Sequence, residues 1–305
     1  MESPLFSSIL EELDLSPEER RVAVDLNWRG FAVLDFPDDE ILERIDHIKT
    51  DLTPRFDVDF SDPQSPKHGS IGRIQDAWQF DENVRAIAAN AKVMQLLSKL
   101  YGRRAFPFQT LNFPVGTQQQ LHSDSIHFSC IPERFMCGVW LAMEDVHPDA
   151  GPLTYLPGSH KWPIVNNAMI GRRGWRSELD SAQTPFETAW AALVASSPEQ
   201  QEVFLPRKGQ ALIWAANLLH GGSMQNDMRL TRWSQVTHYY FADCIYYTPA
   251  FSDEPLGRLD LRTIRNIATG GIEPNVYLGE KVSRVDAEPA KRAWRWPRRK
   301  RHKAA

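Results

Sequence analysis

The sequence predicts a mainly β fold with flanking α-helices: a double-stranded β-helix, or jelly roll, whose core is buttressed by N-terminal helices. Up to Gly102, apolar residues recur at helical spacing. After Gly102 they form short runs rich in β-branched and aromatic residues, separated by Pro, Gly and Asp. Helices followed by many short strands indicate packed sheets supported by helices. Since no linker rich in Gly, Ser or Pro divides the chain before residue 285, we predict a single domain over residues 1–285.

Residues 1–102 form the predicted helical part of this domain. We expect helices over residues 5–13, from Ser16 onward, over residues 38–52 and over residues 81–102, with a short strand over residues 30–36. Ser16 followed by Pro17 is typical of a helix start, with the serine as N-cap. Gly102 is typical of a helix end.

Residues 103–245 form the predicted jelly-roll core. Its strands are expected in FPFQTLNF, RFMCGVWLAMEDV, GPLTYLPG, QALIWAANLLH and RWSQVTHYYF. Residues 164–202 interrupt these runs, and we interpret them as an insertion that contains a helix in FETAWAALVAS.

Composition indicates a cytoplasmic globular protein. The three cysteines, Cys130, Cys137 and Cys244, show no CxxC spacing, and their odd number argues against a disulfide framework. We therefore expect a reducing compartment and buried thiols. The N-terminal residues lack the basic and apolar regions of a secretory signal, and no apolar run is long enough for a transmembrane helix.

The pair His122 and Asp124, in QQQLHSDSIHF, predicts a metal site. In a strand, residues i and i+2 point to the same face, so the imidazole and the carboxylate can meet one ion. A second histidine would complete a facial triad of two histidines and one carboxylate, which suits non-haem Fe(II) and leaves coordination positions open. His220 is the candidate, because it ends the apolar run ALIWAANLLH and opens a predicted glycine turn, HGGS, at the end of a strand.

Arg232 and Ser234 are candidates for binding an anion near that metal. Both lie in the predicted strand RWSQVTHYYF, two residues apart and therefore on one face. A buried arginine can bind a carboxylate through two parallel hydrogen bonds, and the serine hydroxyl can donate a third.

Together these segments resemble the phytanoyl-CoA dioxygenase-like branch of the Fe(II)/2-oxoglutarate-dependent oxygenases. The resemblance runs from about Arg73 to Tyr240 through LHSDSIHF, WLAMEDVHPDAGPLTYLPGSHK, IWAANLLHGGS and the Arg232 strand. It implies that His122, Asp124 and His220 bind Fe(II).

The resemblance also implies a cosubstrate site. Arg232 would bind the distal carboxylate of 2-oxoglutarate, and Trp140, Gln109 and Arg73 occupy positions where the family places groups near it. The implied reaction consumes O2, releases succinate and CO2, and hydroxylates an unactivated C–H bond of a small molecule or a lipid- or carrier-linked substrate.

Two departures leave alternatives open. The family usually has His-Gly-Ser after the distal histidine, whereas Gly222 takes the place of that serine here and the serine is displaced to Ser223. The interval from His220 to Arg232 is one residue longer than usual, which makes Arg229 a rival carboxylate anchor.

Two alternative functions use the same scaffold. Desaturation or ring formation would use the same ligands, and a non-catalytic jelly-roll binding module would keep the fold without turnover. Asp124 argues against a halogenase, because halogenases similar to this family replace the carboxylate with a small residue.

The residues just after the metal motif, and two further histidines, are also assigned roles. Phe128 is expected to line the pocket, and His127 either packs in the core or reaches the substrate. His147 and His160 follow turns rich in Pro and Gly, and we interpret both as structural.

The C-terminal residues 286–305 form a basic tail. The last sixteen residues contain eight Lys or Arg and no acid, and without these charges the net charge of −4 becomes about −12 on the remaining chain. Trp294 and Trp296 alternate with Arg295, so one interpretation is an anchor that holds the protein peripherally on an anionic membrane surface. The other interpretations are a solubilising tail and non-specific phosphate binding, while the acidic body argues against a specific nucleic-acid partner and against strongly anionic substrates.

Overall fold

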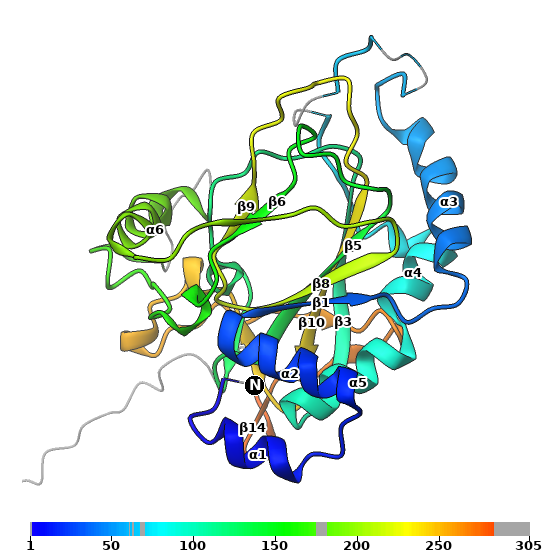
Figure 1. Ribbon diagram of the computed structural model, residues 1–305. Coiled ribbons are helices and arrows are strands. Elements are labelled where there is room, and N and C mark those ends of the chain that lie inside the picture. Colours follow the sequence, from blue (N-terminus) through cyan, green and yellow to red (C-terminus); the bar gives the residue numbers. More distant parts are fainter. Residues whose placement is uncertain (1, 61, 63, 68–70, 175–181, 284–305) are drawn as a thin grey trace, which may run out of the picture.

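Two layers of antiparallel strands with helices on one side form the structure, a computed structural model that describes residues 2–60, 62, 64–67, 71–174 and 182–283 (Figure 1). The large sheet has the strand order β1-β8-β5-β10-β3-β2. Its strands are β1 (Phe31–Asp35), β2 (Ile74–Gln75), β3 (Ala105–Phe113), β5 (Met136–Ala142), β8 (Gln210–Ala215) and β10 (Ser234–Phe241).

The facing layer consists of two smaller antiparallel sheets. One contains β6 (Leu153–Tyr155), β7 (Glu202–Phe204) and β9 (His220–Gly222); the other contains β4 (Ser129–Ile131) and β11 (Ile245–Tyr247). Two short hairpins follow towards the C-terminus: β12 (Ile264–Arg265) with β13 (Ile272–Glu273), and β14 (Val276–Tyr277) with β15 (Glu280–Lys281).

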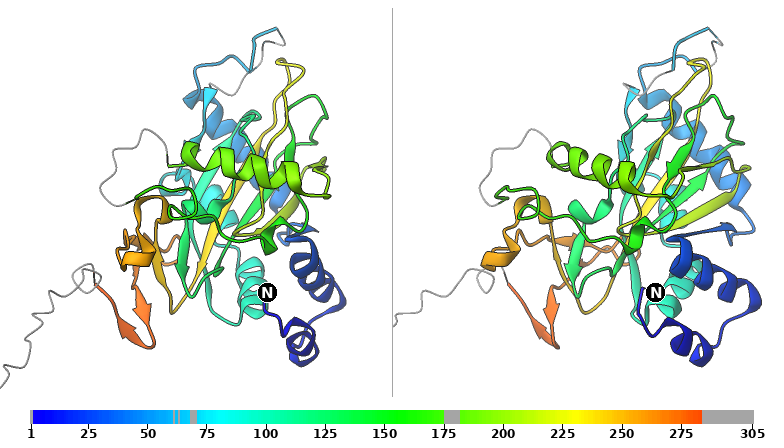
Figure 2. Two further views of the ribbon diagram at one scale, coloured as in Figure 1. Left: turned by 90° about the vertical axis from the view of Figure 1, so that its left-hand side faces the viewer. Right: turned by 60° about the vertical axis from the view of Figure 1, so that its left-hand side comes forward.

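Helices cover the outer face of the large sheet. They are α1 (Phe6–Glu12), α2 (Pro17–Arg29), α3 (Ile41–Leu52), α4 (Glu82–Ala88) and α5 (Ala91–Tyr101). The inserted helix α6 (Thr184–Ser196) lies apart from them, on the other side of the molecule from α3 and α4 (Figures 1 and 2).

Alternation along the strands of the large sheet divides its side chains between two cores. On β5, Val139 and Leu141 face the helices and belong to the cluster that includes residues of α1 to α5. Trp140 faces the other way and packs with residues of the smaller sheet, among them Leu153 and Phe204. Because successive residues of a strand point to opposite faces, one strand supplies both cores. The second core lies between the large sheet and the smaller sheets, and a functional site can form there.

The N-terminal part of the chain is integrated into this sheet. Ser16 caps α2 in a capping box with Glu19, as its sequence pattern indicates, and β1 pairs with β8 along its whole length. The described residues contain no helix with both the length and the apolar character needed to cross a bilayer. The predicted boundary at residue 285 and the basic tail lie outside the described residues.

One predicted helix is wrong in extent. Residues 81–102 form α4 and α5 instead of one helix, because the chain leaves helical geometry at Ala89 and Asn90. The Asn90 side chain accepts a hydrogen bond from the backbone N–H of Val93 and so starts a new helix. The predicted end at Gly102 is confirmed, with φ of 68°.

His160 is a buried structural histidine and carries a pH prediction. Its side chain is 0% exposed, and Nε2 donates a hydrogen bond to the carbonyl of Asn27 near the end of α2. Burial lowers the pKa of His160 to about 4, although the Asn27 carbonyl acts in the opposite direction.

The unfolded chain therefore binds a proton at His160 that the folded chain excludes, between pH 6.5 and about 4. Stability should fall by roughly 3 kcal/mol as the pH falls through that window. Urea denaturation at several pH values, compared with His160→Gln, measures this contribution. An equal pH slope in both proteins would contradict it.

Candidate metal centre

His122 and His220 are brought together by the backbone. They form an isolated antiparallel bridge in which the N–H of each residue donates to the carbonyl of the other, at 2.9 and 3.0 Å. This pairing places the two rings with centroids 4.5 Å apart. The histidine at the start of β9 is thus held against a segment about a hundred residues earlier in the chain.

The local structure at both histidines differs from the prediction. His122 and Asp124 do not lie in a strand: Asp124 begins a short 3-10 helix (Asp124–Ile126), capped by the Ser123 side chain. His220 does not end a strand either; it begins β9, and Gly221 and Gly222 continue that strand instead of forming a turn. The two side chains still converge, because the bridge and the helical turn aim them at one point.

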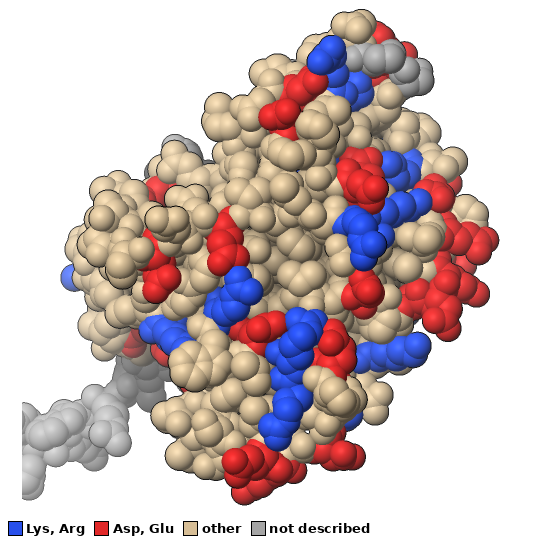
Figure 3. All heavy atoms as spheres, viewed as in Figure 1, with Lys and Arg blue, Asp and Glu red and all other residues tan. Residues whose placement is uncertain are grey.

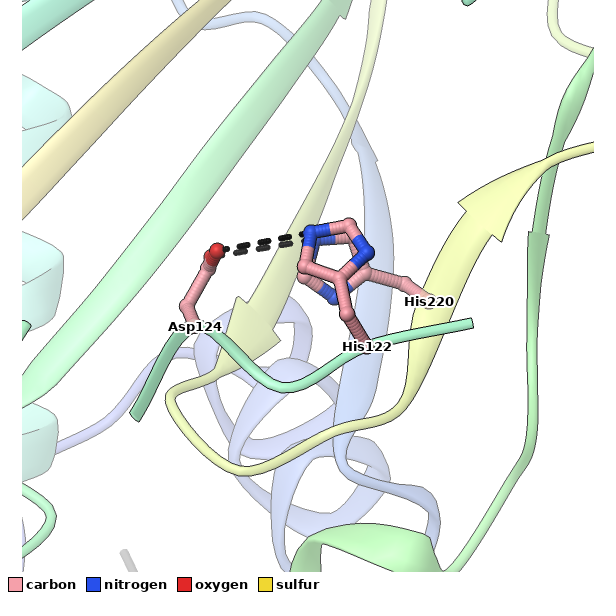
Figure 4. A group of neighbouring side chains, drawn as sticks. All are labelled: His122, Asp124 and His220. Atoms are coloured by element: carbon pink, nitrogen blue, oxygen red, sulfur yellow. Dashed lines mark ion pairs between the residues drawn. The ribbon is translucent and has the colours of Figure 1, made fainter. Parts of the chain in front are cut away.

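Asp124 completes a group of three potential ligands (Figure 4). Its carboxylate lies 3.8 Å from Nε2 of His122 and 3.7 Å from Nε2 of His220. One ligand atom from each of the three residues lies within 4.8 Å of the others, and all three side chains are buried. Such spacing fits a single ion that bonds to all three.

Hydrogen bonds orient both imidazoles towards that point. Nδ1 of His122 lies 2.9 Å from the carbonyl of Gln120, and Nδ1 of His220 lies 2.9 Å from the carbonyl of Leu218. A carbonyl only accepts, so each Nδ1 carries the proton and each Nε2 keeps its lone pair for a metal. This is the arrangement that metal-binding histidines need.

The protonation states also suit a metal. Burial lowers the pKa of His122 to about 3, with His220 acting in the same direction, so the imidazole is neutral. Burial alone would raise the pKa of Asp124, but His220 and His238 outweigh it and hold that pKa below its usual range. A neutral imidazole and a carboxylate are the forms that coordinate cations.

Trp214 fixes the carboxylate. Its indole Nε1 donates a 2.8 Å hydrogen bond to Oδ2 of Asp124. The indole lies against Gly138 of β5, where an added Cβ would stand 2.1 Å from the ring. Only glycine at position 138 therefore leaves room for the group that orients Asp124.

Trp214→Phe should weaken metal binding without unfolding the protein. The phenyl ring keeps most of the packing but loses the donor to Asp124, and loss of such a supporting hydrogen bond typically costs about tenfold to a hundredfold in metal affinity. Titration with Co(II), followed by absorbance, measures the change. Trp190→Phe is the matched control, because that buried tryptophan packs in a different core with Phe186. Equal affinities in both variants would contradict the role of Trp214.

The two glycines after His220 allow a close approach of neighbouring chain. A Cβ on Gly221 would lie 2.5 Å from the carbonyl oxygen of Gln119, and a Cβ on Gly222 would lie 2.8 Å from the backbone nitrogen of Gln118. Larger residues would push the 118–120 segment away and with it His122. This explains why glycine stands at position 222.

A cavity of about 350 Å³ opens from the metal site. His122, Asp124 and His220 line it, as do Arg232, Trp140, Gln109 and Arg73. Arg232 is 3% exposed and lies with its guanidinium carbon 5.4 Å from the centre of the Trp140 ring. Nη2 of Arg232 donates a 3.4 Å hydrogen bond to the carbonyl of Val115. Its Nε is buried and has no partner among the described residues.

Arg232 is charged despite its burial. Burial lowers its pKa to about 10, with Glu144 acting in the opposite direction, so the guanidinium keeps its proton at neutral pH. A buried charge without an acidic neighbour in contact is costly unless a ligand pairs with it. Arg232 therefore favours the binding of an anion in the cavity.

The other predicted cosubstrate residues occupy different positions. Ser234 is buried and does not line the cavity, and its hydroxyl has no partner in the described part of the chain. Gln109 is half-buried on β3, opposite His238 of β10, and Arg73 is exposed at the cavity wall. The rival Arg229 lies outside the cavity, exposed and paired with Asp227 at 2.7 Å.

His127 and Phe128 both line the cavity. The sequence reasoning missed Trp214 and His238, which also line it; Nε2 of His238 lies 3.5 Å from Oδ2 of Asp124. The sequence did contain a signal for His238. It lies four positions after Ser234 and six after Arg232, and even spacings place residues on the same face of a strand.

Comparisons with solved structures show the same fold. The chain is similar to the non-heme alpha-ketoglutarate-dependent carbocyclase SnoK from nogalamycin biosynthesis, with 15% identity over 82% of this chain and 94% of that chain and a TM-score of 0.56. It is similar to EctD from S. alaskensis, determined with 2-oxoglutarate and 5-hydroxyectoine, with 17% identity over 79% and 80% of the two chains and a TM-score of 0.55.

A third similar structure is the epimerase SnoN, determined with Fe3+, alpha-ketoglutarate and nogalamycin RO, with 17% identity over 75% of this chain and 85% of that chain and a TM-score of 0.53. At these identities the likeness establishes the fold, and it confirms the predicted jelly roll with flanking helices. No curated protein matches the sequence.

A family model identifies the chain more directly. The model described as "Phytanoyl-CoA dioxygenase (PhyH)" matches residues 39–227, which is more than half of the 305 residues. The matched range contains His122, Asp124 and His220 and ends before Arg232. The chain therefore belongs to the phytanoyl-CoA dioxygenase family, as its sequence motifs predicted.

Proposed function

We propose that this protein is an Fe(II)/2-oxoglutarate-dependent dioxygenase that hydroxylates an unactivated C–H bond of a small-molecule substrate. The observation that carries the proposal is the shared cavity. It holds the three buried potential ligands and, in the same wall, the buried Arg232, whose Nε has no partner among the described residues. One set of residues fits a metal and the other fits the anion that must accompany it.

The donor set fits Fe(II) in particular. Two imidazole Nε2 atoms and one carboxylate make a facial triad, which occupies one side of an octahedral ion and leaves positions for other ligands. Among the described residues, the group that can share one ion contains these three side chains and does not include His238. A closed tetrahedral site of the structural zinc type would need a fourth protein ligand.

Arg232 fits the far carboxylate of 2-oxoglutarate. Its Nε edge, where Nε has no partner among the described residues, can donate two parallel hydrogen bonds to a carboxylate. Trp140 packs against the guanidinium and limits where the arginine can point. These residues would hold the cosubstrate in one orientation.

When bound in this site, Fe(II), 2-oxoglutarate and O2 supply an oxidation in which one oxygen atom enters succinate, CO2 is released and the other oxygen atom enters the substrate C–H bond. The protein contributes position and shielding. Aromatic side chains, among them Trp214, Phe113 and Phe128, line the cavity and limit the access of water.

Product mass distinguishes the proposed reaction from its alternatives. The protein, loaded with Fe(II) without oxygen, is mixed with 2-oxoglutarate and a metabolite extract and then exposed to O2. Hydroxylation adds one oxygen atom to a substrate, whereas desaturation or ring closure removes two hydrogen atoms and epimerisation leaves the mass unchanged. SnoK and SnoN are named as a carbocyclase and an epimerase, so the fold permits these outcomes.

Succinate formation tests the dioxygenase against a binding module. A dioxygenase releases succinate in an amount that depends on Fe(II) and 2-oxoglutarate. Protein that binds neither Fe(II) nor 2-oxoglutarate and forms no succinate would be a binding module, and the proposal would be wrong.

A further inference from the structure

Three basic side chains surround Phe128 at one end of the cavity. The ring centres of His127 and His238 lie 5.9 and 5.0 Å from that of Phe128, and the guanidinium carbon of Arg262 lies 4.9 Å from it. All four residues line the cavity. We call Phe128, His127, His238 and Arg262 the Phe128 cluster; the proposed iron and cosubstrate sites do not use Arg262.

Arg262 has an unpaired edge. Its side-chain hydrogen bonds both use Nη1, to the carbonyl of His127 at 3.4 Å and to the hydroxyl of Thr248 at 3.2 Å. Its Nε is buried and has no hydrogen-bond partner within the part of the chain that the structure describes. Among the residues that the structure describes, no carboxylate lies within ion-pair distance of this guanidinium. The remaining Nε edge can donate the paired hydrogen bonds that a carboxylate or phosphate accepts.

His238 has a second unpaired group in the same cluster. Its Nε2 lies 3.5 Å from Asp124, the residue is 3% exposed, and its buried Nδ1 has no partner in the described ranges. Buried polar atoms are nearly always paired in folded proteins, so two orphans around one aromatic ring indicate a missing partner. The cluster thus contains two polar atoms ready for a ligand.

The charge of the cavity points to an anion. Among the described residues that line the cavity, Asp124 is the one acid, whereas three arginines line it: Arg73, Arg232 and Arg262. The outer face in Figure 3 instead mixes Lys and Arg with Asp and Glu. This local excess of positive charge outweighs the inference from the acidic body, because charges in a partly buried cavity are screened less than distant surface charges.

Arg232, which is buried, and Arg262, which is half-buried, contact different parts of the cavity wall. Arg232 contacts Val115 and Trp140, whereas Arg262 contacts His127, Phe128 and Thr248. The carboxylate of 2-oxoglutarate would pair with Arg232 and would leave the charge of Arg262 without a partner. Arg262 is left for a second anion.

We propose that the prime substrate carries an oxyanion, a carboxylate or a phosphate, which binds the Nε edge of Arg262 in the Phe128 cluster. This inference rests on the proposed function, because it places the C–H bond to be oxidised between Arg262 and the metal ligands. Thr248 and the His127 carbonyl hold the guanidinium in place through hydrogen bonds, and the Phe128 ring lies 4.9 Å from its carbon.

The test measures binding of simple anions to protein that is loaded anaerobically with Fe(II) and saturated with 2-oxoglutarate, so that Arg232 is already occupied. The probes are octanoate, benzoate and phenyl phosphate, with octanamide and benzamide as neutral counterparts, in isothermal titration calorimetry. We expect at least one anion to bind about tenfold more tightly than the neutral probes, and Arg262→Gln to remove that difference. The carboxylate and phosphate arms show which oxyanion is preferred.

Matched variants separate this site from other causes. Arg262→Lys keeps the charge but loses the paired donors and should bind with intermediate affinity. Arg265→Gln removes an exposed arginine that does not line the cavity and should bind like wild type. Thermal denaturation of each variant shows whether it is folded. Wild-type protein that binds none of the three anions, or a preference that survives Arg262→Gln, would overturn the inference.

The visible absorption of the Fe(II)–2-oxoglutarate complex reports the proposed function separately. Arg262→Gln should leave this absorption unchanged, because the residue contacts neither the metal ligands nor Arg232. Absence of the absorption in wild type would contradict the proposed function, whereas normal absorption without anion preference would contradict only the second site.

Discussion

Replacement of Asp124 by Ala should abolish metal-dependent turnover, with a loss of about a thousandfold or more, since several kcal/mol of transition-state stabilisation come from a bound catalytic metal. The carboxylate is the one anionic ligand of the site and lies between His122 and His220. Without it, two neutral imidazoles in a cavity rich in positive charge must hold a divalent cation. Succinate formation at saturating 2-oxoglutarate measures the effect.

Asp35→Ala is the control for this variant, because that exposed carboxylate lies on β1 and accepts a hydrogen bond from Gln210. It should retain full turnover. Metal-free Asp124→Ala should stay folded in thermal denaturation, which separates a lost ligand from a lost fold. Turnover close to wild type in Asp124→Ala would show that the iron binds elsewhere.

Replacement of Arg232 by Gln should raise the KM for 2-oxoglutarate by about a hundredfold, because paired hydrogen bonds from a buried guanidinium to a carboxylate are lost. The glutamine keeps a polar side chain, but it is shorter than arginine and carries no charge. A steady-state titration of 2-oxoglutarate, at fixed Fe(II), measures KM and kcat separately.

Arg229→Gln is the matched control and also tests the rival anchor. Arg229 is exposed and paired with Asp227, so its loss should leave the KM for 2-oxoglutarate within about twofold of wild type. A large rise in Arg229→Gln and none in Arg232→Gln would reverse the assignment of the carboxylate anchor.

The candidate site was largely readable from the sequence because its chemistry uses rare residue types in a fixed order. His122, Asp124, His220 and Arg232 were chosen by type and spacing, and the structure places all four in one cavity. The change from helical to strand-like periodicity after Gly102 likewise predicted the arrangement of layers, since that period determines which faces can be buried.

Local geometry was less predictable. The convergence of His122 and Asp124 was predicted from a strand, but an isolated bridge to His220 and a 3-10 turn produce it. Short polar segments such as this one have no periodicity that reveals their conformation, and tertiary contacts decide it. The two glycines were predicted to form a turn, yet their role is the close packing of Gln118 and Gln119.

Supporting residues were the hardest to predict. Trp214 reads as an ordinary core aromatic in an apolar run, and its hydrogen bond to Asp124 exists only because Gly138, on another strand, leaves space for the ring. Arg262 lies beyond every recognised motif, in a segment without strong periodicity. Such roles depend on pairs of distant residues, which one sequence does not reveal.

The most direct test of the metal assignment is anomalous X-ray diffraction at the iron absorption edge from crystals grown anaerobically with Fe(II). The account predicts one strong peak bonded to Nε2 of His122, Nε2 of His220 and a carboxylate oxygen of Asp124, at about 2 Å from each, as for other divalent first-row metals. A peak elsewhere in the protein, or one enclosed by four protein ligands with His238 as the fourth, would contradict it.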